Sequence, residues 1–87
     1  MDDLKLRTLK LRCRDLPVAI RIGKNAITKT MLIEAERQLK KNKLIKLKFL
    51  KASFESFSKE EMIDMMVSGT NSTLIETIGN TFVIYKN

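Results

Sequence analysis

The transition from strand to helix between residues 18 and 29 constrains the fold of this chain more than any other stretch. An apolar, β-prone run, Val18–Ile22, ends abruptly at Gly23, and a helical pattern begins at Thr28. Alternate residues of the run would face a core, with Arg21 on the opposite face beside the turn. Threonine caps helices by accepting a hydrogen bond from a first-turn amide. The stretch therefore predicts a strand that passes into a helix through a short turn led by glycine.

The residues that follow complete a β-α-β unit. Apolar residues recur with helical spacing as far as Asn42, in the stripe Met31, Leu32, Ala35 and Leu39. Leu44–Phe49 then alternates strictly between apolar and basic residues, which predicts a strand with Lys46 and Lys48 pointing to solvent. Two strands that are joined by a helix pair in parallel, so we expect these two to be parallel neighbours.

Helical and strand patterns also account for the two ends of the chain. A helix is expected over Leu4–Cys13. After a loop at Ala52–Phe57, a capping box at Ser58–Glu61 begins a helix that Gly69 is placed to end. Two strands, 73–78 and 81–86, then flank the turn pair Gly79-Asn80. The predicted fold class is α/β in one domain, 1–87, with the order α-β-α-β-α-β-β and helices packed on a four-stranded mixed sheet.

The charge distribution points to a polyanionic partner. The net charge is +7. Residues 1–52 carry most of the basic groups, whereas residues 53–87 hold two basic and five acidic ones. A surface divided in this way suits a polyanion that approaches from one side.

Several classes of protein are disfavoured by what the sequence lacks. There is no histidine, and Cys13 is the single cysteine, so we expect no enzyme, no metal site and no cofactor. No apolar run approaches the roughly 18 residues that span a bilayer. Nothing near the first residue reads as a secretion signal. One cysteine without a partner favours a reducing compartment, so the cytoplasm is the expected location.

The turn after the first predicted strand is a candidate phosphate site. It carries Lys24 and Asn25 directly before the N-terminus of a predicted helix. Free backbone amides and the partial positive charge of the helix end favour an anion there. Many strand-to-helix turns of this kind bind nothing, so the surrounding positive charge gives the interpretation its weight.

Three segments in order resemble the CRM domain, named for chloroplast RNA splicing and ribosome maturation. They are residues 16–28, LPVAIRIGKNAIT, residues 44–48, LIKLK, and residues 78–85, IGNTFVIY, and the resemblance covers about residues 5–86. It implies an RNA-binding module with a sheet similar to that of the C-terminal domain of translation initiation factor three. It also implies a GxxG loop similar to that of KH domains, which clamp the nucleic-acid backbone. Stand-alone prokaryotic members are associated with ribosome assembly, mainly with precursors of the large subunit.

Gly23, Lys24 and Asn25 fit the family's loop, and Ala26 replaces its second glycine. A Cβ at Ala26 is expected to disfavour a positive φ and to hold the backbone further from a phosphate. The predicted RNA-binding residues are Arg21, Gly23, Lys24, Asn25, Ala26, Lys29, Lys40, Lys41, Lys43, Arg12 and Arg14.

The expected partner is structured RNA, with ribosomal RNA as the family's example. Two alternatives stay open: a protein that coats DNA, because phosphate contacts alone do not select RNA, and a protein-interaction module that docks on an acidic partner.

Overall fold

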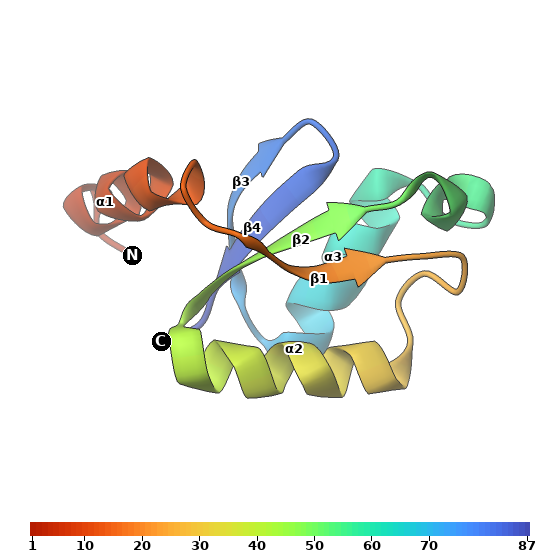
Figure 1. Cartoon of the computed structure of the whole chain (residues 1–87). Coiled ribbons are helices and arrows are strands. Elements are labelled where there is room, and N and C mark those ends of the chain that lie inside the picture. Colours follow the sequence, from red (N-terminus) through yellow and green to blue (C-terminus); the bar gives the residue numbers. More distant parts are fainter.

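The computed structural model describes residues 1–87, and its elements follow the predicted order (Figure 1). The helices are α1 (Asp3–Cys13), α2 (Lys29–Asn42), α3 (Lys59–Thr70) and a short 3-10 helix, η1 (Lys51–Glu55). The strands are β1 (Val18–Ile22), β2 (Leu44–Phe49), β3 (Thr73–Ile78) and β4 (Thr81–Tyr85). They form one mixed sheet in the order β1-β2-β4-β3.

The predicted β-α-β unit is confirmed. β1 and β2 are parallel neighbours, with Ile20 opposite Leu47 and Ile22 opposite Phe49. β4 lies between β2 and β3 and is antiparallel to both. Its apolar residues on both faces agree with this interior position, because a central strand is covered on two sides. Gly79 adopts a positive φ of 57° in the predicted hairpin turn.

Each face of the sheet has its own hydrophobic cluster. The larger cluster joins alternate strand residues such as Leu47, Phe82 and Ile84 to α2 and α3. The smaller cluster joins the residues between them, such as Val83, to α1 through Leu9 and Cys13. Figure 1 shows α2 and α3 below and behind the sheet, whereas α1 lies at one end of the sheet, to the upper left. The second face is therefore covered over only part of its length.

The partial cover by α1 corrects one prediction. Lys46, expected to point to solvent, is only 9% exposed, whereas Lys48 on the same strand face is exposed. The alternation of the strand assigned both lysines correctly to the face opposite Leu47. It could not reveal that a helix remote in sequence covers one end of that face.

The predicted end of α3 is also wrong. The helix continues through Gly69 to Thr70, and Asn71 ends it in the left-handed conformation, with φ 54°. Asparagine tolerates this conformation better than most residues, because its short polar side chain bonds locally. Glycine is required at position 69 for packing, because a Cβ there would lie 2.7 Å from Leu32 Cδ2 on α2. The absent side chain lets α2 and α3 approach closely.

The segment between β2 and α3 is more ordered than the predicted loop, because it includes η1. Phe54 of η1 packs at a tilt on the buried Phe49, with ring centroids 5.5 Å apart, so it covers the core as expected while remaining 38% exposed. The predicted capping box is confirmed: the Ser58 amide donates to Glu61 Oε1 at 2.9 Å, and the Glu61 amide donates to Ser58 Oγ at 3.1 Å. The hydrogen bonds that Ser58 gives to the Glu61 carboxyl lower the pKa of that group below its usual value.

We predict that stability depends on the larger cluster and little on the outer face of α1. Leu47 is fully buried in that cluster, so Leu47→Ala should lower the free energy of unfolding by about 2–5 kcal/mol. The matched change Leu4→Ala, at a side chain that is 73% exposed, should shift it by less than about 0.5 kcal/mol. Urea unfolding measures both values, and equal losses would contradict this assignment of the core.

Candidate nucleic-acid interface

The chain between β1 and α2 begins with a tight turn. The Ala26 amide donates to the Gly23 carbonyl oxygen at 2.9 Å, which places Lys24 and Asn25 at the two central, exposed positions. The backbone amides of these two residues form no hydrogen bond within the protein. The turn therefore presents two free N–H donors at the surface, which is the arrangement that binds anions in backbone concavities.

The conformation of Ala26 corrects the expectation about the family's second glycine. Ala26 adopts a positive φ of 54°, although this conformation costs an L-residue roughly 1–2 kcal/mol. The residue is only 2% exposed, and its methyl group belongs to the larger cluster. The Cβ thus points into the core, and it does not hold the backbone of the turn away from a phosphate.

Nothing inside the protein requires a glycine at position 23. Its φ lies outside the positive region, and a Cβ added there would meet no atom within 4 Å. The position is open to solvent at the point where β1 ends. The missing side chain leaves the main chain accessible to a molecule outside the protein.

The N-terminus of α2 has no acidic group of its own. Thr28 caps it as predicted, by accepting a hydrogen bond from the Met31 amide at 3.1 Å. α1 and α3 both carry acidic residues in their first turns, whereas α2 begins with Lys29. Because a helix N-terminus carries partial positive charge, the potential at this end of α2 favours an anion from outside.

Further cations gather at the same edge of the sheet. Arg21 on β1 is the register partner of Lys48 on β2, and both side chains are exposed. The Leu50 amide donates to the Ile22 carbonyl oxygen at 2.9 Å, so the chain leaving β2 stays beside the end of β1 and brings Lys51 there. Lys48 and Lys51 were absent from the residues predicted from sequence. The predicted parallel pairing was the signal for them, because parallel strands end at the same edge.

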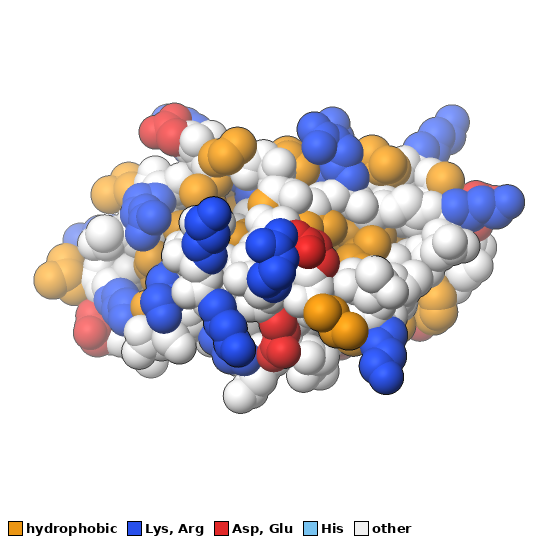
Figure 2. All heavy atoms as spheres, turned by 60° about the horizontal axis from the view of Figure 1, so that its bottom comes forward, with side chains coloured by type: hydrophobic (Ala, Val, Ile, Leu, Met, Phe, Trp, Pro, Cys, Tyr) orange, Lys and Arg blue, Asp and Glu red, His pale blue; other side chains and the backbone are white.

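The predicted cluster Lys40, Lys41 and Lys43 lies at the opposite end of α2. The 14 residues of this helix separate its ends by about 20 Å. Glu34 and Glu36 lie between them, and Figure 2, with α2 brought forward, shows red side chains between blue ones. Hydrogen bonds from Arg37 and Gln38 lower the pKa of the Glu34 carboxyl, which keeps this negative charge in place. The basic surface along α2 is therefore interrupted.

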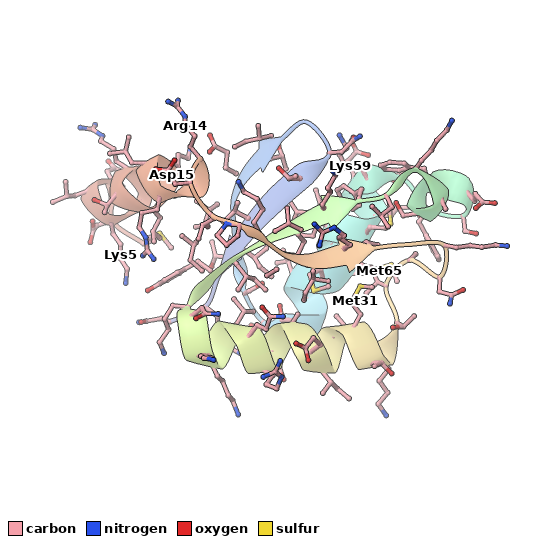
Figure 3. The ribbon with its side chains drawn as sticks, viewed as in Figure 1. Lys5, Arg14, Asp15, Met31, Lys59 and Met65 are labelled. Carbon is pink, nitrogen blue, oxygen red and sulfur yellow. The ribbon has the colours of Figure 1, made fainter.

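The predicted cations of the first helix lie on another side of the molecule. Arg12 and Arg14 are at the C-terminal end of α1, which packs on the sheet face opposite to α2. Figure 3 shows Arg14 directed away from α2. The structure thus brings together Arg21, Gly23, Lys24, Asn25, Ala26 and Lys29, and it places the other predicted residues in two separate groups. The charge distribution predicted one basic surface, whereas the structure has three basic regions: the Gly23–Ala26 turn, the C-terminal end of α2 and the C-terminal end of α1.

Most of the basic side chains have no acidic partner. The structure has two salt bridges, Arg37 to Glu34 and Lys86 to Glu36. None of the cations near the Gly23–Ala26 turn takes part in either, so their charges are available to an external anion. No group of histidine, cysteine and carboxylate side chains could hold a metal ion, and no helix is both long and apolar enough to cross a bilayer.

Sequence comparison identifies the relatives of this chain. The family model of the CRS1/YhbY (CRM) domain matches residues 1–86. The "Probable RNA-binding protein YqeI" of Bacillus subtilis is 31% identical over 80 residues, which are 92% of this chain and 81% of that protein. An "RNA-binding protein" of Haemophilus influenzae is 32% identical over 78 residues, 90% of this chain and 77% of that protein. Both names describe binding proteins and not enzymes.

The fold also matches a solved structure. The solution structure of a hypothetical protein from Staphylococcus aureus superposes with a TM-score of 0.79 at 25% sequence identity. The match covers 100% of this chain and 88% of that one. Agreement over the whole chain includes α1, so the helix on the second face of the sheet belongs to the shared fold.

We predict that Ala26 tolerates glycine but not a larger residue. Ala26→Gly relieves the left-handed strain but removes a buried methyl group and adds freedom to the unfolded chain, so stability should change by less than about 1 kcal/mol. Ala26→Val adds a branched side chain in the same conformation within a packed core and should destabilise by about 2 kcal/mol or more. Urea unfolding of both variants tests this, and a neutral valine would show that the Cβ does not face the core.

Proposed function

Because this chain belongs to the CRS1/YhbY (CRM) domain family, we propose that it binds structured RNA through the Gly23–Ala26 turn and the first turn of α2. The names of the relatives support RNA as the partner. The observation that carries the proposal is the pair of unbonded amides at Lys24 and Asn25, beside a helix N-terminus without acidic residues. Both features favour an anion at one place.

A backbone phosphate at this turn would meet three kinds of group. The amides of Lys24 and Asn25 would donate hydrogen bonds to its oxygens, and the side chains of Lys24 and Lys29 would supply charge. Hydrogen bonds to a charged group are roughly twice as strong as neutral ones. Gly23 has no side chain to obstruct the approach, which accounts for a glycine that neither its φ nor its packing requires. In this mode of binding the protein contacts the phosphate backbone of the RNA and no base edge.

The aromatic residues favour structured RNA over an unpaired strand. Proteins that bind single strands stack bases on exposed aromatic side chains. Here Phe49, Phe82 and Tyr85 are buried, and the partly exposed Phe54 and Phe57 lie in the stretch rich in acidic residues. The one aromatic ring near the basic turn, Phe54 of η1, already packs on Phe49, so binding depends mainly on the shape and the charge of the RNA backbone.

We further propose that the RNA is ribosomal and that the protein acts in the cytoplasm during assembly of the large subunit. The family relation supports this finer assignment. Crosslinking in the native cell, followed by sequencing of the attached RNA, tests it: the expected reads map to large-subunit ribosomal RNA. Reads spread evenly over messenger RNA would overturn the ribosomal assignment and leave RNA binding intact.

Two further experiments separate the proposal from the two alternatives, the DNA-coating protein and the protein-interaction module. A DNA-coating protein would bind duplex DNA and duplex RNA equally in a competition at fixed salt, whereas the proposal expects a preference for RNA. A module that docks on an acidic protein would still co-purify with its partner after nuclease treatment, whereas an RNA-mediated association would be lost.

We predict a steep dependence of affinity on salt. Each phosphate contact releases condensed counterions, so log K should fall with log salt, with a slope of about −0.7 to −0.9 per contact. We expect roughly four to seven contacts, given the cations near the turn and those further away. Titrations of one RNA at several salt concentrations measure the slope, and a nearly flat affinity would reject the electrostatic mechanism.

We predict that the two ends of α2 contribute unequally. Lys24→Gln with Lys29→Gln removes the two lysines of the turn and the first helical turn, and affinity should fall at least about tenfold, or 1.4 kcal/mol. Lys40→Gln with Lys41→Gln makes the same chemical change at the far end of the helix, where the loss should be smaller than about threefold.

The two pairs are matched in residue type, in charge change and in exposure, since all four side chains are exposed. RNA titration and thermal melting of both variants complete the experiment, and neither should melt at a lower temperature than the parent. Equal losses of affinity would indicate a diffuse attraction to positive charge. A larger loss for the Lys40 and Lys41 pair would move the site away from the turn.

A further inference from the structure

A groove of about 870 Å³ lies on the second face of the sheet, between α1 and residues of β2, β3 and β4. Arg7, Lys10 and Arg14 of α1 line one wall, at intervals of three and four residues that place them on one side of the helix. Lys46 of β2 and Glu76 of β3 come from the sheet. Nothing in the proposed function above uses this groove.

Lys46 is the unusual residue of the groove. Its side chain is buried to the extent that only 9% of the residue is exposed, yet its ammonium has no salt bridge and no hydrogen bond to the protein. No fully buried side-chain nitrogen in the structure lacks a partner, so this ammonium must still meet solvent, and the groove is the space that Lys46 lines. The stem of Lys46 is covered while its ammonium reaches the groove with free N–H donors. The position favours an anion that enters from outside.

The other charges around Lys46 leave the groove open to such an anion. Asp3, Asp15 and Glu76 also line it, but none of them forms a salt bridge with a cation of the groove. Figure 3 shows Arg14 and Asp15 at the same end of α1. Burial raises the pKa of the Cys13 thiol and the charge of Glu76 adds to this, whereas Lys46 and Lys10 oppose it. Charges of both signs, from Glu76, Lys46 and Lys10, therefore act near Cys13 at the C-terminal end of α1.

A line of cations connects the groove to the turn. Lys48 lies two residues beyond Lys46 on the same face of β2, about 7 Å further along the strand. Its neighbour across the sheet is Arg21, which precedes the Gly23–Ala26 turn. Neither Lys48 nor Arg21 has a salt bridge. A polyanion held at the turn would thus meet unpaired cations continuously until it reached Lys46.

We propose that this groove is a second phosphate site for the same RNA, with Lys46 against one backbone phosphate and Arg7, Lys10 and Arg14 beside its neighbours. The proposal rests on the function proposed above and extends the contact from the turn across the open face of the sheet. A protein carboxylate offers similar chemistry, but the line of cations through Lys48 and Arg21 favours a partner with regularly repeated negative charge.

The test separates a binding role of Lys46 from a structural one. Lys46→Met keeps an unbranched apolar stem and removes the ammonium. Because methionine keeps the covered stem and the ammonium bonds to nothing in the protein, the melting temperature should stay unchanged. Its affinity for an RNA duplex of about 16 base pairs should fall roughly three- to tenfold, and the salt slope should become shallower by about 0.7–0.9. A residue with only a structural role would change the melting temperature without changing the salt slope.

A short hairpin and two further variants sharpen the result. A hairpin with a stem of only about four base pairs should be too short to reach from the turn to Lys46, so Lys46→Met should bind it like the parent. Lys46→Arg should retain affinity for the long duplex, because it keeps the charge. Lys59→Met, on α3, is the matched control, since its ammonium bonds only to the Gly79 carbonyl oxygen, and it should bind both RNAs like the parent.

The outcomes distinguish the two proposals. If the parent binds neither RNA, the RNA-binding function and the groove fall together. If the parent binds and Lys46→Met matches it on the long duplex, the groove proposal alone is overturned. An equal loss on both RNAs would mean that the groove is not a second site. Binding of polyglutamate that depends on Lys46, with unchanged RNA affinity, would replace RNA by an acidic protein as the occupant.

Discussion

The parallel pairing of β1 with β2 is the constraint on which the rest of the structure depends. It places the ends of both strands at one edge, where the Leu50 amide binds the Ile22 carbonyl oxygen. The Gly23–Ala26 turn, the N-terminus of α2 and the start of η1 are therefore neighbours. Because backbone hydrogen bonds hold this arrangement, exposed residues such as Lys24 and Asn25 can serve binding without being needed for the fold.

The charges of the protein are arranged for a partner more than for its own stability. Only two salt bridges form, both involving residues of α2, and the cations near the turn remain unpaired. Uncompensated like charges repel one another and slightly destabilise the compact state. The two hydrophobic clusters have to offset this repulsion, and an RNA backbone would relieve it. The left-handed Ala26 fits the same pattern, since it accepts a local cost beside a proposed contact.

The position of α1 gives the second face of the sheet two different parts. At one end, Leu9 and Cys13 of α1 pack on Val83 and its neighbours. At the other end, Lys48 and Arg21 remain exposed. The groove lies at the boundary between these parts, where a helix rich in cations meets a strand that carries lysine. The proposed path for RNA runs from the turn, at the edge where β1 and β2 end, to the groove at this boundary.

The sequence by itself determined the three longer helices, the four strands, their order and the parallel pairing of β1 with β2, but not η1 or the end of α3. Alternation in Leu44–Phe49, the cap at Thr28, the capping box at Ser58 and the turn at Gly79 are local signals, because each depends on residues within a few positions. The family relation and the residues of the turn were also accessible from the sequence, since they form a continuous segment.

Only the tertiary structure decided which of these residues lie together. In the folded protein α1 covers most of Lys46, and Gly69 lies at the contact between α2 and α3. The Ala26 methyl group points into the core, and the length of α2 separates Lys40 from Lys24. The tertiary structure also added Lys48 and Lys51 to the edge that carries the turn. The physical reason is that periodicity assigns a side chain to a face, whereas contacts between segments distant in sequence decide whether that face is covered.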